Sequence, residues 1–204
     1  TIDQGRPLHV FDADKINGDL TLHLSQDGDS VKTLDNKEYK LSKINTIISD
    51  SNNIHGIAGV IGGLESGCSE KTKNVFLEVA SFKPSGIAKS ARSLGIFSDA
   101  RQRFERGIDS DSIYWGVEAA SQMISELCGG DASEFVVTEI KKREIKKINF
   151  DTNKISSFGG VNIDIKDQYK ILNSLGFKVR ENKSILEIEI PTFRPDIVGE
   201  ADIV

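Results

Sequence analysis

Apolar and polar residues alternate with period two in the first quarter of the chain, and this pattern predicts short β-strands. One strand is expected at Thr21–Leu24 and another from Asn45 to Ile48. Clusters of Asp, Asn, Gly and Ser at residues 27–29, 35–37 and 49–53 are typical of turns. We therefore expect a meander of antiparallel hairpins, preceded by an arm over residues 1–14.

Helical spacing of apolar residues follows later in the chain. Pro84 suits the first turn of a helix and Gly95 suits its end. Residues 109–130 give the clearest helix, which ends at Gly129 and Gly130. We interpret its apolar stripe as facing the core rather than a site; the stripe consists of Ile113, Val117, Ala120, Ile124 and Leu127.

The composition changes at about residue 140. The charge run 139–147 is interpreted as a solvated strand edge or a connector. A second small unit follows, with a helical start near Asp151, a helix at 165–175, strands at 177–180 and 185–190, and a helical pattern at 199–204. We expect an α+β fold with mainly antiparallel sheets, divided into domains 1–140 and 145–204.

Charge limits the classes of function. The 204 residues carry a net charge of −5, which argues against a protein that coats nucleic acid. The window 83–106 is nevertheless basic, with Lys83, Lys89, Arg92, Arg101, Arg103 and Arg106 against Asp99 and Glu105. This segment is either a solvated face with internal ion pairs, such as Arg101–Glu105, or a surface that contacts phosphates.

Cysteine and histidine usage predicts neither a disulfide framework nor a zinc site. The two cysteines are far apart and the three histidines are scattered, which is typical of a reducing cytoplasm. No apolar run approaches the roughly 18 residues that a membrane span needs. The chain starts at Thr1 and stops at Val204 within a helical pattern, so we expect it to be part of a longer protein.

Residues 54–63 are apolar and unusually rich in glycine. Such glycines either allow close packing or form a backbone wall beside a ligand. A nucleotide-phosphate loop is disfavoured, because the run lacks the Gly-Lys-Ser/Thr ending of a P-loop.

Glu78 follows in an apolar strand of a probable central sheet, on the same face as Phe76 and Ala80. Its face is either exposed, or it holds a buried carboxyl group that must gain a proton or a hydrogen-bond donor. His9 lies among the apolar residues Leu8, Val10 and Phe11 of the arm, and is either a hydrogen-bonded, half-buried histidine or a ligand contact.

Five motifs occur in one order, at residues 5–12, 58–63, 77–78, 98–107 and 191–196. Together they closely resemble the bacterial phenylalanyl-tRNA synthetase beta subunit, over essentially the whole chain. The resemblance implies that residues 1–140 are an editing domain, which hydrolyses tyrosine wrongly attached to the tRNA for phenylalanine. It implies that residues 145–204 are the small domain that follows.

The resemblance also implies roles for single residues. Glu78 matches the glutamate that recognises the tyrosine hydroxyl, and His9 matches a histidine near the ester-bearing end. Gly59 and Gly62 match glycines that line the amino-acid pocket, and Ala100 matches a small residue whose enlargement would fill that pocket. Ser98 stands where many relatives have threonine, and Gln102 stands where some relatives have histidine.

Mechanism and partners follow from the same resemblance. No Ser/His/Asp or Cys/His arrangement is visible, so the resemblance implies attack by a positioned water, with His9 and Ser98 as orienting groups. From charge, Arg92, Arg101 and Arg106 are candidates for contact with the tRNA acceptor end.

The implied assembly is an alpha2 beta2 tetramer with the alpha subunit, which holds the ATP site, in the cytoplasm. Asp196 and Asp202 match two acidic magnesium ligands at the interface with that subunit, and further ligands lie beyond Val204. Two alternatives remain: a non-catalytic scaffold that binds tRNA or assembles subunits, and a nucleotide-binding domain built on the glycine run, which the missing lysine disfavours.

Overall fold

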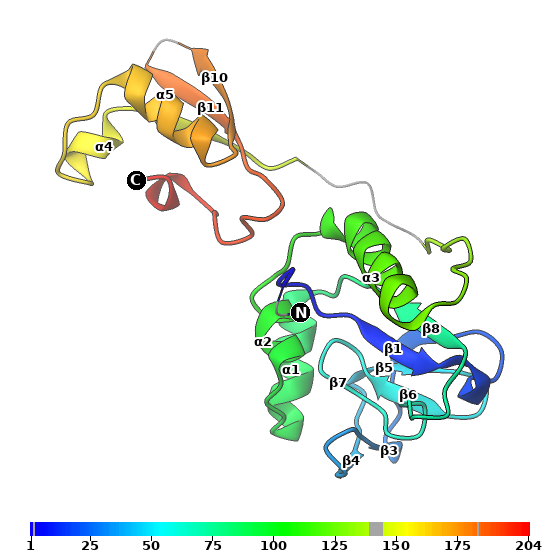
Figure 1. The fold of residues 1–204 in the computed structure, drawn as a ribbon. Helices are drawn as coiled ribbons and strands as arrows, with labels where there is room; N and C mark the ends of the chain where they lie inside the picture. The colour runs from blue at the N-terminus through cyan, green and yellow to red at the C-terminus, as the bar shows by residue number, and fades with distance from the viewer. Residues whose placement is uncertain (2, 139–144, 183) are drawn as a thin grey trace. The chain divides into compact units, whose positions relative to one another are not determined.

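A computed structural model describes residues 1, 3–138, 145–182 and 184–204 (Figure 1). The chain divides into two compact units, Thr1–Gly129 and Gly130–Val204. Each has its own buried cluster of apolar side chains, and sheets of antiparallel strands pack with helices in both. The α+β class is therefore confirmed. No helix in the described part of the chain is long and apolar enough to cross a membrane.

The described part of the first unit contains three small antiparallel sheets (Figure 1). The largest has the order β2-β5-β6-β7. The others pair β3 with β4 and β1 with β8. The strands are β1 (His9–Asp12), β2 (Thr21–Leu24), β3 (Ser30–Lys32), β4 (Glu38–Lys40), β5 (Thr46–Ser49), β6 (Ile54–Ile57), β7 (Ile61–Gly62) and β8 (Val75–Glu78).

One expectation about these strands needs correction, and the pairing of the glycine-rich run is a new finding. The strand that carries Glu78 is not part of a central sheet, because β8 pairs only with β1 among the described strands. The glycine-rich run is a hairpin, in which β6 and β7 pair and Gly56 lies opposite Gly62. A strand's partner depends on distant segments, so local pattern could not assign it.

The described residues of this unit also form four helical segments: η1 (Ala13–Lys15), α1 (Pro84–Leu94), α2 (Asp99–Phe104) and α3 (Ser112–Cys128). Helix α1 begins at Pro84 and ends at Leu94, just before Gly95, which has φ 66° and closes the helix as predicted. It buries Ile87 and Ala91 against the core, whose other members are Val31, Leu41, Ile47, Ile57, Val60, Ile96 and Phe104.

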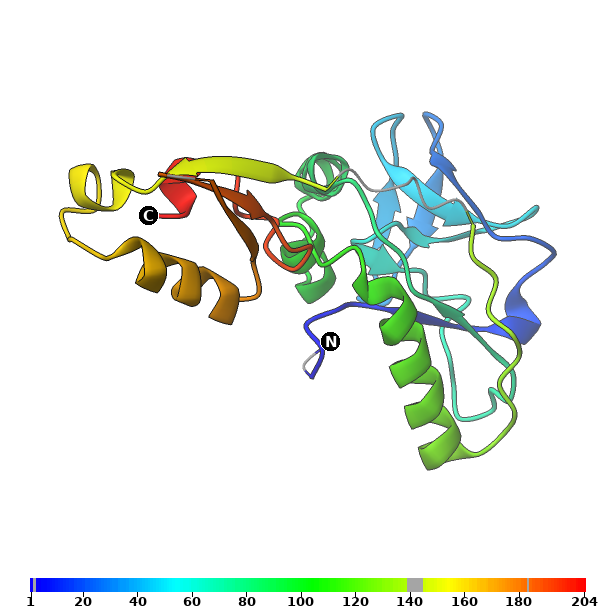
Figure 2. The same cartoon turned by 90° about the horizontal axis from the view of Figure 1, so that it is seen from above.

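Helix α3 forms where it was predicted, but the assignment of its stripe to the core is wrong. It lies at the edge of the unit (Figure 2), and its buried residues are Ser112 and Gly116. Leu127 of the stripe is 78% exposed. The helix is anchored through its first turns by Arg6, whose buried guanidinium donates to the carbonyl and hydroxyl oxygens of Ser112.

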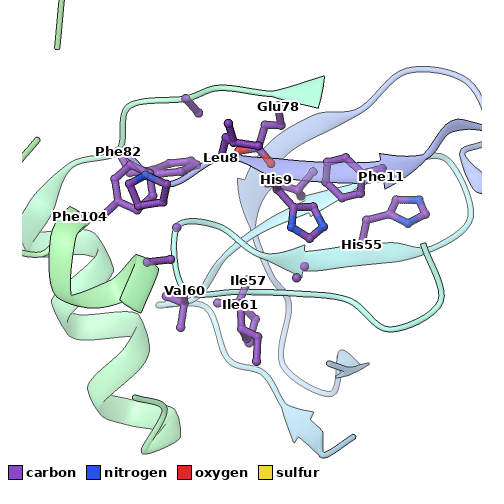
Figure 3. Close-up of a pocket in the computed structure, with 17 residues that line it drawn as sticks. Leu8, His9, Phe11, His55, Ile57, Val60, Ile61, Glu78, Phe82 and Phe104 are labelled. Atoms are coloured by element: carbon purple, nitrogen blue, oxygen red, sulfur yellow. The ribbon is translucent and has the colours of Figure 1, made fainter. Parts of the chain in front are cut away.

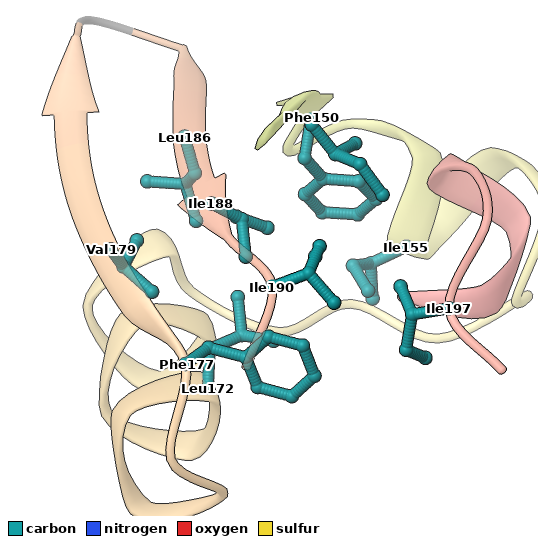
Figure 4. Packing of buried hydrophobic residues seen from close by; sticks show 10 residues of the cluster. Phe150, Ile155, Leu172, Phe177, Val179, Leu186, Ile188, Ile190 and Ile197 are labelled. Atoms are coloured by element: carbon teal, nitrogen blue, oxygen red, sulfur yellow. The ribbon is translucent and has the colours of Figure 1, made fainter. Parts of the chain in front are cut away.

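The second unit is a three-stranded antiparallel sheet with the order β10-β11-β9, packed against a helix (Figures 1 and 2). Its core includes Phe150, Leu186 and Ile188, all fully buried (Figure 4). Strand β9 was not predicted; most of the charge run before it, residues 139–144, lies outside the described residues. The elements are β9 (Lys147–Asp151), α4 (Lys154–Ser157), α5 (Ile165–Ser174), β10 (Lys178–Asn182), β11 (Ile185–Glu189) and η2 (Glu200–Asp202).

Candidate functional site

A small cavity of about 70 Å³ lies in the first unit (Figure 3). Its walls come from the arm and β1, the β6–β7 hairpin, the end of β8 and helix α2. Most of the lining is apolar or glycine, as in many small-molecule sites. Three titratable side chains also line it: His9, His55 and Glu78.

Glu78 is the last residue of β8 and is half-buried beside this cavity. Among the described residues, its carboxyl group has no hydrogen-bond or ion-pair partner. Burial raises the pKa of Glu78 to about 7, because a desolvated carboxylate is disfavoured. The exposed alternative for Glu78 is therefore wrong, whereas Phe76 of the same strand is 46% exposed.

His9 lies directly opposite Glu78 in the pairing of β1 with β8. Directly paired residues project to the same side of a sheet, so the imidazole and the carboxyl group face one cavity (Figure 3). The Nε2 atom of His9 is buried without a hydrogen-bond partner among the described residues. Burial lowers the pKa of His9, which favours a neutral ring at pH 7.

Sequence reasoning missed a buried pair at the same cavity. The Nε2 atom of His55 lies 2.7 Å from the Asp50 carboxylate, and its Nδ1 atom has no partner in the described part of the chain. Burial by itself would raise the pKa of Asp50, but donors from Asn17, His55, Asn52 and Asn53 outweigh burial and lower it. The available signal was an Asp in a turn five residues before a His in a strand.

The glycines of the hairpin allow close packing, and three of them also line the cavity. Gly56, Gly59 and Gly62 line the cavity. A Cβ atom on Gly62 would collide with the His9 ring, and one on Gly63 would lie 2.7 Å from the His55 carbonyl oxygen. Gly59 has φ +66°, a conformation that other residues rarely adopt.

Ser98 does not line the cavity but holds one of its walls. As the N-cap of α2, its hydroxyl oxygen accepts from the Arg101 backbone N–H and donates to the Val60 carbonyl at 2.5 Å. This contact ties the helix to the turn of the hairpin. Ala100 and Phe104 of α2 consequently face the cavity.

The arginines of the basic segment 83–106 differ in their exposure in the folded protein. Arg101 is buried, and it donates to Glu105 at 3.0 Å and stacks over the Phe97 ring at 4.7 Å. The predicted Arg101–Glu105 pair is therefore confirmed, and burial removes Arg101 from the candidate tRNA contacts. Arg92 and Arg106 are exposed.

The candidate magnesium ligands lie in the second unit and are both engaged. Asp196 pairs with Arg194 at 2.7 Å, and Asp202 accepts backbone N–H groups from Val198 and Gly199 at 2.8 Å. No group of three or more potential metal ligands occurs among the described residues. These two carboxylates alone therefore do not fit a magnesium shell, and we derive no chemical step through the ion.

Comparisons with known proteins agree with the two units. Residues 1–129 match the B3/4 domain family. The chain belongs to this family. Residues 148–204 match the tRNA synthetase B5 domain.

The chain is similar over its whole length to phenylalanine–tRNA ligase beta subunits. It is 40% identical to the one from Mesorhizobium japonicum and 41% identical to the one from Brucella suis, and it spans 25% of each relative's length. The resemblance inferred from the five motifs is thereby confirmed. An N-terminal fragment of the phenylalanyl-tRNA synthetase beta subunit from Pyrococcus horikoshii aligns with 96% of this chain and 57% of its own, with a TM-score of 0.46 and 16% identity.

Proposed function

We propose that the first unit hydrolyses the ester between tyrosine and the tRNA for phenylalanine. The observation that carries this proposal is an unpartnered carboxyl group, Glu78, at the wall of a small, mostly apolar cavity. We take residues 1–140 as this editing domain and residues 145–204 as the small domain after it. Both would belong to a beta subunit that works with an alpha subunit, where ATP is used, in an alpha2 beta2 ligase of the cytoplasm.

The site would select tyrosine over phenylalanine by requiring the hydroxyl group that only tyrosine carries. A pocket shaped for phenylalanine cannot strongly reject an analogue that only adds a hydroxyl, whereas a site that must hydrogen-bond a hydroxyl rejects the analogue without it by roughly 10⁴–10⁵. The hydroxyl of tyrosine would donate to Glu78. Phenylalanine would leave the buried carboxyl group without a partner, which is costly.

The remaining groups would shape the site and position water. His9 faces the cavity beside Glu78, and its neutral ring would orient the attacking water. Gly59, Gly62 and Ala100 would leave room for the amino acid. Ser98 would act by holding α2 in place, through its contact with the hairpin.

The deciding experiment measures hydrolysis of Tyr-tRNA and Phe-tRNA by the full alpha–beta enzyme. We expect rapid release of tyrosine and slow release of phenylalanine. If the enzyme released tyrosine no faster than phenylalanine, the alternative of a non-catalytic scaffold that binds tRNA or assembles subunits would replace this proposal.

The pKa of Glu78 predicts how tyrosine binding depends on pH. A raised pKa of about 7 means that the carboxyl group is mostly protonated below pH 7 and ionised above it. The ionised form accepts the stronger hydrogen bond from a phenol. The affinity for tyrosinol, a ligand without an ester, should therefore rise about tenfold between pH 6 and pH 8.

Calorimetric titration of the enzyme at several pH values measures this effect. Phenylalaninol, which lacks the hydroxyl, should show no such rise. Glu78→Gln should make tyrosinol binding independent of pH over the same range. An unchanged pH dependence in that variant would assign the titration to another group, such as His9, which also lines the cavity.

A further inference from the structure

Phe11 lies between two histidines that line the cavity, His9 and His55 (Figure 3). The centroids of the His9 and Phe11 rings are 4.3 Å apart, and the ring planes meet at 72°. The centroids of the Phe11 and His55 rings are 6.2 Å apart, at an angle of 75°. Both pairs are edge-to-face, which is a favourable arrangement of aromatic rings. Both histidines therefore pack against the same buried phenylalanine.

Packing has to fix the orientation of the His9 ring. A buried histidine is normally oriented by hydrogen bonds to its ring nitrogens, but the Nε2 atom of His9 has no partner among the described residues. Two neighbours enclose the ring instead. Phe11 contacts it edge-on, and the backbone of Gly62 lies so close that a Cβ atom there would collide with it. A displacement of Phe11 would therefore free the His9 ring to turn.

His55, by contrast, is held by hydrogen bonds. Its Nε2 atom lies 2.7 Å from the Asp50 carboxylate, and the two side chains are 2% and 0% exposed. Asp50 in turn accepts backbone N–H groups at 2.7–2.8 Å, from Asn17, Asn52 and Asn53. A carboxylate bonded through both oxygens to the main chain cannot rotate without losing several of these bonds. The His55 ring is thus a fixed support for Phe11.

We propose that His55 is a positioning residue for hydrolysis, because it holds the His9 ring in place through Phe11. Asp50 fixes the far end of this path. The inference rests on the proposed function, in which His9 orients the attacking water. Such a group must keep its place, since a displacement of about 1 Å can cost roughly 10²-fold in rate. His55 acts here through its neighbour and not by contact with the ester.

The chain contains three histidines, so the path can be followed by NMR of the 204-residue protein labelled with ¹⁵N-histidine. The exposed His23 of β2 supplies a reference signal. In the wild type we expect nuclear Overhauser contacts from Phe11 to the rings of both His9 and His55. Absence of either contact would overturn the proposal, independently of any variant.

His55→Gln keeps a hydrogen-bond donor near Asp50 but removes the ring that packs against Phe11. We expect the ring signals of His9 to shift and broaden in this variant, because the ring loses its fixed orientation. Unmoved His9 signals would mean that His55 is only a packed core residue, and the proposal would be wrong. Phe11→Leu breaks the path at its middle and should move the His9 signals too, so it provides the same test if His55→Gln does not fold.

The matched control is His23→Gln. His23 also makes a side-chain hydrogen bond, to Ser49 at 2.8 Å, but it is exposed and does not line the cavity. This variant should leave the ring signals of His9 and His55 in place. Its rate of Tyr-tRNA hydrolysis should equal that of the wild type.

Hydrolysis of Tyr-tRNA by the full alpha–beta enzyme tests what the path does. His55→Gln should lower the single-turnover rate about tenfold and leave the half-saturating concentration within about twofold, because the pocket keeps its contacts with tyrosine. His9→Gln should also lower the rate. The double variant should be no slower than His9→Gln alone, because the two residues act as a unit. Effects that multiply in the double variant would overturn the proposal.

Failure of this inference can be told from failure of the proposed function. A wild-type enzyme that releases tyrosine no faster than phenylalanine contradicts the proposed function, and the NMR signals of His9 still decide whether His55 supports its ring. A wild-type enzyme that releases tyrosine rapidly, together with a His55→Gln variant of equal rate, contradicts this inference alone.

Discussion

Replacing Glu78 with glutamine is expected to slow hydrolysis of Tyr-tRNA by about 5- to 13-fold at pH 8, where the carboxyl group is ionised. A hydrogen bond to a charged group contributes roughly 1.5–3 kcal/mol and a neutral one roughly 0.5–1.5 kcal/mol. Glutamine still offers a neutral acceptor, so the variant loses about 1–1.5 kcal/mol of transition-state binding, which gives this range of rates. Glutamine keeps the size of the side chain, so the cavity should keep its shape. The measurement is deacylation of Tyr-tRNA and Phe-tRNA by the full alpha–beta enzyme under single-turnover conditions.

The slow hydrolysis of Phe-tRNA should not change in this variant, because phenylalanine makes no hydrogen bond to Glu78. Glu70→Gln supplies a matched control, since Glu70 is exposed and does not line the cavity. It should hydrolyse both substrates at the wild-type rates. Wild-type release of tyrosine by Glu78→Gln would show that another group recognises the hydroxyl.

Gly59→Ala should destabilise the protein by about 2–5 kcal/mol, through two separate effects. An alanine at φ +66° adopts a left-handed conformation, which costs roughly 1–2 kcal/mol. Its Cβ atom would also lie 2.7 Å from Ile87 Cδ1 and 2.8 Å from Phe82 Cδ2, and overpacking of this kind costs roughly 1–3 kcal/mol. Urea unfolding of the 204-residue chain measures the free energy directly.

Gly95→Ala separates the two effects. Gly95 has the same φ of +66°, but a Cβ atom there would meet no atom within 4 Å. It should therefore lose only the backbone contribution, roughly 1–2 kcal/mol. Equal destabilisation by the two substitutions would mean that the cavity wall yields to an added methyl group, and that close packing does not require Gly59.

Local signals predicted those parts of the fold that local interactions control. Helix α1 follows from a proline at its first turn and a glycine in the left-handed conformation after its last. Strand β11 follows from strict alternation over residues 185–190. Both elements obey rules of backbone geometry and side-chain periodicity that act within a few residues.

Burial was predicted less well because it depends on a partner. The stripe of α3 has helical spacing, yet Leu127 is 78% exposed and the fully buried positions are Ser112 and Gly116. Arg101 shows the converse, since a cation counted toward the basic surface is buried among Glu105, Phe97 and the Ile96 carbonyl. The spacing of residues along one helix predicts neither the exposure of Leu127 nor the burial of Arg101.

The sequence by itself determined that Glu78 lies in an apolar strand, that glycines crowd residues 54–63, and which family of proteins shares these motifs. Only the tertiary structure decided which side chains share the cavity. It pairs β1 with β8, which sets His9 beside Glu78, although 69 positions separate them in the sequence. It also adds His55, held by Asp50. The physical reason is that strand pairing is a long-range interaction, whose partner and register no local pattern specifies.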